Sequence, residues 1–444
     1  MTFVATVDCA GVDYAALAGF NPNWYCCPVD DPSVEDSMAR MVVDREVLGY
    51  TLGNRDFRLL WGDSISAGTG MSGEHVVLSL LAYQLTDSSV WVGVTLALYF
   101  VPSLLVGGIA GAIADWMDRR DLIRRCEFGF AVLLAVFGLM LLYDAVTLAG
   151  VLSLSVATGL LHALYSPARL SYAYDLVGTE RAVGGLSMLN LGFRVGQLLG
   201  ALSAGWLMSN FGAAYAFFAL GAGHGVGYLL LAQLRTTGLA AERDSSSLRD
   251  NLRVFRGELR RNKDLLVLIA VMVSVAVLGF SYTTALPELA AGDLGVGAAE
   301  LGYMHAARAT GGLIGVVVLT ALGLFSRRGL LLLCTIVPFG VGLIWVGLST
   351  SLTVILIALV VTAAATAIYD VLTQSVLQIV VPNKLRGRAM GVWVFIVGIE
   401  PAGHVMLGIT ISLLGVGSAM QLNGGLLLLI GIVVFRYSPR LRRL

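Results

Sequence analysis

The chain has 444 residues, of which 57% are hydrophobic and 13% are charged, and its mean hydropathy is +0.82. About a quarter of the residues in a soluble protein are charged, so this composition excludes an ordinary soluble domain and predicts a chain embedded mostly in lipid. The formal net charge is zero, which leaves no electrostatic basis for binding nucleic acid.

The first segment, residues 1 to 53, differs from the rest of the chain. It is acidic, has few apolar runs, and lacks the basic region followed by an apolar region that marks a secretory signal. We therefore expect a disordered cytoplasmic tail. An alternative is that translation begins at Met38 or Met41, which would remove most of this tail.

Twelve apolar windows follow, each of about 20 residues and so long enough to cross a bilayer as a helix. The first six cover residues 59–81, 91–113, 126–146, 151–173, 183–207 and 213–234. The second six cover residues 265–286, 299–323, 329–348, 352–379, 389–413 and 418–436. The predicted fold class is an all-α integral membrane protein with twelve transmembrane helices in two six-helix bundles, residues 54–234 and 265–436.

Lysine and arginine residues indicate the orientation in the membrane. They occur in the turns after even-numbered spans, in the 235–264 linker and at both termini, whereas the turns after odd-numbered spans contain none. The positive-inside rule then predicts a multi-pass protein of the cell inner (plasma) membrane with both termini cytoplasmic. The second half of the linker has apolar residues at helical spacing, which predicts an amphipathic helix on the membrane surface. Residues 437–444 are expected to form a basic cytoplasmic tail.

A short charged turn, GAIADWMDRRDLIRR, joins the second and third spans. Its small and charged residues are candidates for a loop that takes part in conformational change: Gly111, Asp115, Asp118, Arg119 and Arg120. This pattern resembles the loop between the second and third helices of the major facilitator superfamily. Trp116 stands where the loop of that superfamily has arginine.

The resemblance extends from Asn54 to about Phe435 and is nearest to the transmembrane secretion effectors, the enterobactin-exporter-like and macrolide-efflux-like branch. It rests on four further blocks: NRDFRLLW at 54–61, SPAR at 166–169, GFSYTTALP at 279–287 and VPNKLRGRAMG at 381–391. The resemblance implies the major facilitator fold, an export direction and a small amphipathic substrate, drug-like or siderophore-like. Similar segments at 175–181 and 379–388, six spans apart, also indicate an internal repeat.

The fifth span has a face of small residues at helical spacing: Gly192, Gly196, Gly200 and Gly205. Many exporters of the superfamily have a proline in this span where Gln197 stands here. We interpret the glycines as positions of close helix packing.

Ionisable groups inside membrane spans are costly, and those that occur are usually paired or functional. Four carboxyl groups are candidates for carrying a coupling proton: Glu74, Asp63, Asp370 and Glu400. Four other side chains are candidates for binding substrate or for pairing with these acids: Arg194, Arg308, His305 and His75. Glu74 is the first candidate, because a buried carboxyl group can gain or lose a proton as its surroundings change. A permanent ion pair between Glu74 and Arg194 is the alternative.

Arg194 and Glu400 fall at nearly equivalent positions of the two halves. This predicts a cavity with a basic wall in one half and an acidic wall in the other. Arg308 is expected either to pair with Asp370 or Glu400, or to bind an anionic substrate. Three histidines that stand alone on apolar faces are read as structural: His162, His224 and His404.

The sequence contains no Walker A, HExxH or GxSxG motif. We therefore expect no enzyme activity, no cofactor and no metal, with the proton gradient as the energy source. The resulting prediction is a monomeric secondary transporter that sits in the lipid bilayer and exports a small molecule by proton antiport. An uncoupled facilitator or importer is one alternative, and a membrane sensor or scaffold that transports nothing is another.

Overall fold

The computed structural model of the chain describes residues 53–443 apart from 179–180, 239–261, 322–326, 382–395 and 397. Within these residues the secondary structure is helical throughout. The tail predicted at 1–53 lies outside them except for its last residue. The amphipathic helix predicted in the linker lies outside them too, as does most of the eleventh predicted span before Glu400.

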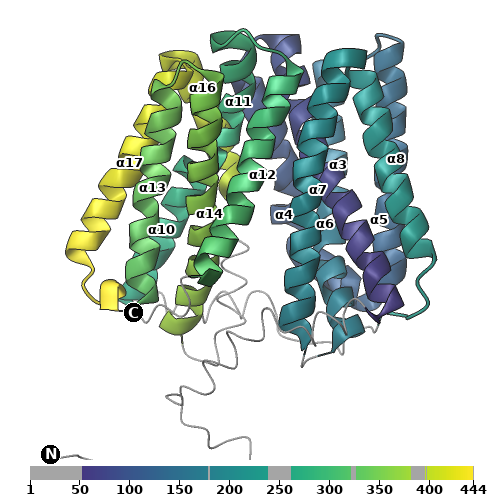
Figure 1. The fold of residues 1–444 in the computed structure, drawn as a ribbon, viewed down its shortest axis with the longest axis horizontal. Coiled ribbons are helices and arrows are strands. Elements are labelled where there is room, and N and C mark those ends of the chain that lie inside the picture. Colours follow the sequence, from purple (N-terminus) through teal and green to yellow (C-terminus); the bar gives the residue numbers. More distant parts are fainter. Residues whose placement is uncertain are drawn as a thin grey trace, which may run out of the picture.

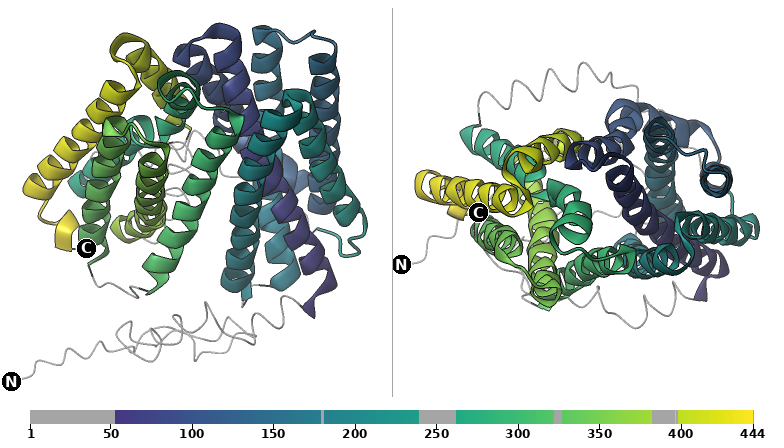
Figure 2. Two further views of the ribbon diagram at one scale, coloured as in Figure 1. Left: turned by 45° about the horizontal axis from the view of Figure 1, so that its top comes forward. Right: turned by 90° about the horizontal axis from the view of Figure 1, so that it is seen from above.

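The described helices form two bundles of six, which lie side by side in Figures 1 and 2. The N-terminal bundle consists of α3 (Arg55–Thr86), α4 (Ser89–Trp116), α5 (Arg119–Leu142), α6 (Leu148–Val177), α7 (Ala182–Phe211) and α8 (Ala213–Ala232). The C-terminal bundle consists of α10 (Lys263–Leu278), α12 (Ala298–Ala321), α13 (Arg328–Leu348), α14 (Leu352–Val380), α16 (Glu400–Leu414) and α17 (Val416–Tyr437). This is the fold class predicted from the apolar windows.

The seventh span is irregular after α10. It continues through a 3-10 turn, η4 (Phe280–Ala285), a short helix, α11 (Leu286–Glu288), and a π turn, η5 (Leu289–Asp293). Among the described residues, seven helical segments, this span included, are long and apolar enough by composition to cross a membrane. Helix α3 is not among the seven; it carries Asp63 and Glu74, both of which are buried inside the protein.

Both bundles begin in the same way, which supports the internal repeat. Asn54 caps α3 by accepting hydrogen bonds from the backbone N–H groups of Asp56 and Phe57, and Asn262 caps α10 in the same way. The amide nitrogen of Asn54 also donates to the carbonyl oxygen of Leu176 at the end of α6, the fourth helix of its bundle. That of Asn262 donates to the carbonyl oxygen of Val380 at the end of α14, the fourth helix of the other bundle.

Helices α3 and α7 pack so closely that glycine is required between them. A Cβ atom added at Gly196 would lie 2.1 Å from the carbonyl oxygen of Ile65, and one added at Gly200 would lie 2.1 Å from that of Thr69. Neither contact is sterically possible, so the small-residue face predicted in the fifth span is confirmed as a packing face.

Gly200→Ala is therefore expected to lower the stability of the folded protein by about 1–3 kcal/mol, because the new methyl group forces α3 and α7 apart. Thermal unfolding of the purified protein in detergent measures the loss. Gly225→Ala on α8 is the matched control, since a Cβ atom there meets no other atom within 4 Å. Equal stability of the two variants would contradict this packing.

The two bundles meet through α7 with α12 and through α4 with α16. A Cβ atom at Gly205 would lie 2.8 Å from the Cα atom of Gly302, and one at Gly408 would lie 2.5 Å from the carbonyl oxygen of Ser89. The Ser89 hydroxyl also donates to the Glu288 carboxylate of α11. These contacts lie toward the face opposite the one where α3 begins and α17 ends. We call the face where α3 begins and α17 ends the terminal face, and the opposite face the far face (Figure 1).

Candidate functional site

A central cavity lies between the bundles and is lined by residues from both. Its volume is about 170 Å³, smaller than the roughly 300–1,000 Å³ of pockets that hold drug-sized ligands. A substrate of that size therefore requires the bundles to move apart from the arrangement seen here.

Six of the eight side chains predicted to carry chemistry in the spans line this cavity: Arg194, Arg308, Asp370, Glu400, His75 and His305. Arg194 belongs to the N-terminal bundle, whereas Arg308 and both acids belong to the C-terminal bundle. The prediction of one basic and one acidic wall is therefore wrong in its simple form, because the C-terminal wall carries both signs. The sequence indicated that these residues lie together, but it did not indicate how they are distributed between the two bundles.

Aromatic side chains line the cavity together with the charged groups. Phe100, Phe280 and Tyr282 line it, and the Phe100 ring stacks on His404 with centroids 5.7 Å apart. His404 is not isolated, as the sequence led us to expect. Its Nδ1 atom lies 2.8 Å from the hydroxyl of Thr284, and its Nε2 atom lies 3.5 Å from a Glu400 oxygen.

The other two predicted acids, Asp63 and Glu74, lie inside the N-terminal bundle and do not line the central cavity. Glu74 is next to His224, with 3.7 Å between its Oε1 atom and the Nε2 atom of the imidazole. The alternative in which Glu74 pairs with Arg194 is not what the structure has. The prediction that His224 stands alone on an apolar face is also wrong.

Glu127 of α5 completes this buried group, and the sequence analysis missed it. Its Oε2 atom lies 2.8 Å from the Nδ1 atom of His224, and its side chain is fully buried. The third apolar window was placed at 126–146, so Glu127 fell at its edge beside the charged turn. The helix in fact begins at Arg119 and buries Leu122, Ile123, Cys126 and Phe130 on the same face. The spacing of these apolar residues could have identified Glu127 as part of the buried face of α5.

The charged turn after α4 is organised around two acidic side chains. Asp118 caps α5 by accepting from the Arg120 backbone N–H group, and it also accepts from the backbone of Gly238. Both Asp175 oxygens, at the end of α6, lie 2.8 Å from Nη1 of Arg119. Gly111 and Asp115 belong to the last turns of α4, and the surroundings of these two residues lie outside what the structure describes.

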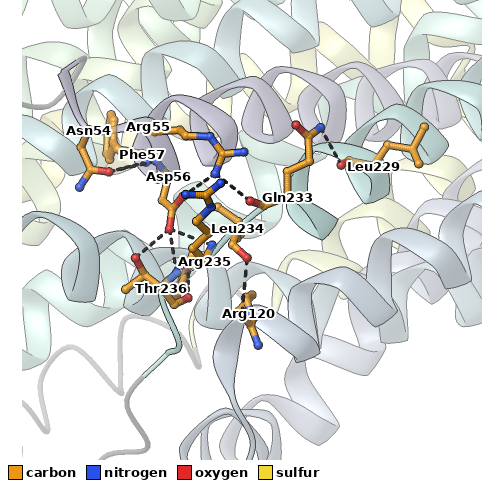
Figure 3. A network of polar contacts seen from close by, with 11 residues as sticks. Asn54, Arg55, Asp56, Phe57, Arg120, Leu229, Gln233, Leu234, Arg235 and Thr236 are labelled. Atoms are coloured by element: carbon orange, nitrogen blue, oxygen red, sulfur yellow. Dashed lines mark hydrogen bonds and ion pairs between the residues drawn. The ribbon is translucent and has the colours of Figure 1, made fainter.

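At the terminal face, the residues after α8 are held against the start of α3 (Figure 3). Asp56 accepts hydrogen bonds from the backbone N–H groups of Arg235 and Thr236, at 3.0 and 2.8 Å, and from the Thr236 hydroxyl at 2.7 Å. The hydroxyl of Tyr172 on α6 donates to the Thr236 carbonyl oxygen. The first residues of the inter-bundle linker are thus fixed to the N-terminal bundle.

Asp56 precedes the apolar part of α3, and its surroundings favour the carboxylate form. Partial burial alone would raise the pKa of Asp56, but the hydrogen bonds from Thr236 and Arg235 outweigh this and hold the pKa below its usual value. The contribution of Asp56 to stability is therefore full above the ordinary pKa of an aspartate and is lost as the pH falls through its lowered value.

Asp56→Asn is expected to destabilise the protein at neutral pH by about 1.5–3 kcal/mol, the usual contribution of hydrogen bonds to a charged group. The difference in stability between variant and wild type should shrink as the pH falls, because wild-type Asp56 then becomes protonated and is neutral, as asparagine is. Thermal unfolding across a pH series measures this. Asp144→Asn is the control, since Asp144 is an exposed turn residue with φ 52°, a conformation that asparagine also adopts. A difference independent of pH would contradict the assignment.

The sequence of this chain matches a described protein family and a named exporter. Residues 51–443 match the family described as transmembrane secretion effector. The enterobactin exporter EntS of Shigella boydii serotype 18 is 26% identical over 373 residues, which cover 82% of this chain and 84% of the exporter.

Solved structures of transporters share the fold. The crystal structure of the nucleoside transporter NupG is 12% identical, covers 86% of this chain and 98% of its own, and superimposes with a TM-score of 0.70. The D-xylose-proton symporter is 14% identical, covers 90% of this chain and 99% of its own, and superimposes with a TM-score of 0.64. At such identities the likeness shows the fold alone.

Proposed function

Since this chain belongs to the transmembrane secretion effector family and is a multi-pass membrane transporter, we propose that it exports a small amphipathic molecule in exchange for protons. The central cavity is the substrate site of this proposal. Both bundles contribute arginine and aromatic side chains to it, and the C-terminal bundle adds two carboxyl groups. This combination is the observation that carries the proposal.

Export follows from alternating access of the cavity to the two sides of the membrane. With the termini cytoplasmic, as the basic residues predict, the far face is the external one. The glycine contacts of Gly205 with Gly302 and of Gly408 with Ser89 then close the external side. Export requires these contacts to break while the terminal face closes, so that a substrate taken from the cytoplasm leaves outside.

The lining of the cavity favours a substrate with anionic or hydrogen-bonding groups on an apolar body. Arg194 and Arg308 can bind carboxylate, phosphate or phenolate oxygens, while Phe100 and Phe280 can pack against apolar rings. The named relative is an enterobactin exporter, and a siderophore-like or drug-like molecule is the substrate class we propose here.

Inverted membrane vesicles test this function directly. Their lumen is acidified by respiration, and enterobactin, a macrolide and ethidium are offered separately from outside. The expected result is that at least one of the three accumulates in the lumen and that a proton ionophore abolishes the accumulation. Transport that persists unchanged after the ionophore would replace the antiporter with a facilitator. No transport of an extended panel of siderophores and amphipathic drugs would favour a sensor or scaffold.

A further inference from the structure

The buried group inside the N-terminal bundle has no role in the substrate cavity. We infer that Glu74, Glu127 and His224 form a proton-binding site, separate from the substrate, in which the imidazole joins the two carboxyl groups. We call these three residues the proton site. Its role in transport rests on the proton coupling proposed above, but its capacity to hold a proton can be measured independently.

The proton site is built from three helices that are far apart in sequence: α3, α5 and α8. His224 lies between the two acids, 2.8 Å from Glu127 and 3.7 Å from Glu74, and all three residues are at most 2% exposed. Its ring is held in place on both sides. The Phe130 ring stacks on it at 4.6 Å between centroids, and a Cβ atom at Gly70 would lie 1.9 Å from its Nε2 atom.

Other ionisable groups face the proton site from neighbouring helices. Asp63 of α3 approaches Glu127, since a Cβ atom at Gly227 would lie 2.7 Å from a Glu127 oxygen and 3.0 Å from an Asp63 oxygen. From α6, the Tyr165 hydroxyl donates to Asp63 at 2.7 Å. Arg169, also on α6, interacts electrostatically with Asp63. His162 of α6 lines the same internal space as Glu74 and His224.

The charges of this region do not balance without an additional proton. With His162 neutral against the rings of Tyr99 and Tyr165, three fully buried carboxyl groups, Asp63, Glu74 and Glu127, face two positive groups, Arg169 and a protonated His224. An uncompensated carboxylate buried within a membrane protein is strongly unfavourable. At least one carboxyl group therefore holds a proton in this conformation.

The carboxyl groups also have unused capacity for hydrogen bonds. Both Glu74 oxygens, one Glu127 oxygen and one Asp63 oxygen are buried without a hydrogen-bond partner among the described residues. Buried polar atoms in native proteins are seldom left unpaired. An extra proton on one of these carboxyl groups supplies a donor that the described side chains otherwise lack.

Helix α3 connects the proton site with the substrate cavity, because it contributes residues to both. Met71 lines both the central cavity and the narrow internal space bounded by Glu74, His162 and His224. His75, the next residue after Glu74, faces the central cavity. A protonated His224 can give its Nδ1 proton to Glu127 or its Nε2 proton to Glu74, and once neutral it can take a proton back from the same acid at the ring nitrogen it has vacated.

Infrared difference spectroscopy of the purified protein in lipid measures this proton without any substrate. Raising the pH removes the carbonyl stretch of a protonated carboxyl group. Glu127→Gln removes one negative charge, so the remaining carboxylates balance Arg169 and His224, and the band is expected to be lost. His224→Gln removes a positive charge, so a second proton is needed and the band is expected to grow. Asp121→Asn, a half-buried residue in the first turn of the same helix α5 and outside the proton site, should leave the band unchanged.

The opposite directions of the two effects separate a proton site from a packing role, and thermal unfolding checks that each variant folds. A band unchanged in both variants would overturn the proton site, even if wild-type transport depends on the proton gradient. A band that responds as expected, together with wild-type transport indifferent to the gradient, would leave the site intact and overturn the proposed antiport instead.

Discussion

Glu74→Gln is expected to abolish proton-driven accumulation of substrate while the protein still folds and still exchanges substrate across the membrane. Glutamine has the shape of glutamate but cannot ionise, so the proton site can no longer alternate between two charge states. The loss should be at least about tenfold, which corresponds to about 1.4 kcal/mol of coupling free energy. Accumulation in vesicles with an imposed pH gradient measures it.

Substrate counterflow without a gradient is the internal control for this variant. Exchange of labelled for unlabelled substrate needs the cavity to alternate but needs no net movement of protons. Glu300→Gln, outside both the cavity and the proton site, serves as the matched variant. If Glu74→Gln accumulated substrate as wild type does, Glu74 would have no part in coupling.

Arg308→Gln is expected to weaken the transport of anionic substrates far more than that of uncharged ones. The Arg308 side chain lines the central cavity, and its Nε atom is buried without a hydrogen-bond partner among the described residues. Hydrogen bonds to a charged group contribute about 1.5–3 kcal/mol. The half-saturation concentration for an anionic substrate should therefore rise by roughly 10–100-fold.

Two further variants define the role of Arg308. Arg308→Lys keeps the charge but loses the planar fork, so it should restore part of the affinity. Arg328→Gln is the control: this arginine donates to the Ser375 hydroxyl and is not in the cavity lining. Equal changes for anionic and uncharged substrates would show that Arg308 supports the cavity structurally instead of contacting the substrate.

The helices and the charged cavity could be predicted from the sequence because both follow from the cost of placing chain in lipid. Apolar windows of fixed length mark the spans, and a charge within a span must face the protein interior. That argument singled out Arg194, Arg308, Asp370 and Glu400, and the resemblance to the superfamily placed their helices around one cavity, which they line in the structure. The packing face of α7 could also be predicted, because helices that pack closely need small residues at helical spacing.

The partners of the buried charges could not be predicted in the same way. Which acid meets His224 depends on the rotation of α3, α5 and α8 about their axes and on their crossing, neither of which a hydropathy window contains. Glu127 was not recognised as buried because an apolar window begins where hydropathy rises, whereas helix α5 begins directly after its capping residue Asp118. Reading the apolar spacing of Leu122, Ile123 and Phe130 back to that cap would have placed Glu127 on the buried face.

The central claim is that substrate leaves as protons enter. Simultaneous recording of substrate flux and proton flux in liposomes containing the purified protein tests it most directly. An outward gradient of transported substrate is expected to drive protons in the opposite direction, and Glu74→Gln and Glu127→Gln are expected to remove the proton flux. Substrate flux without proton movement, or with protons moving in the same direction, would contradict antiport.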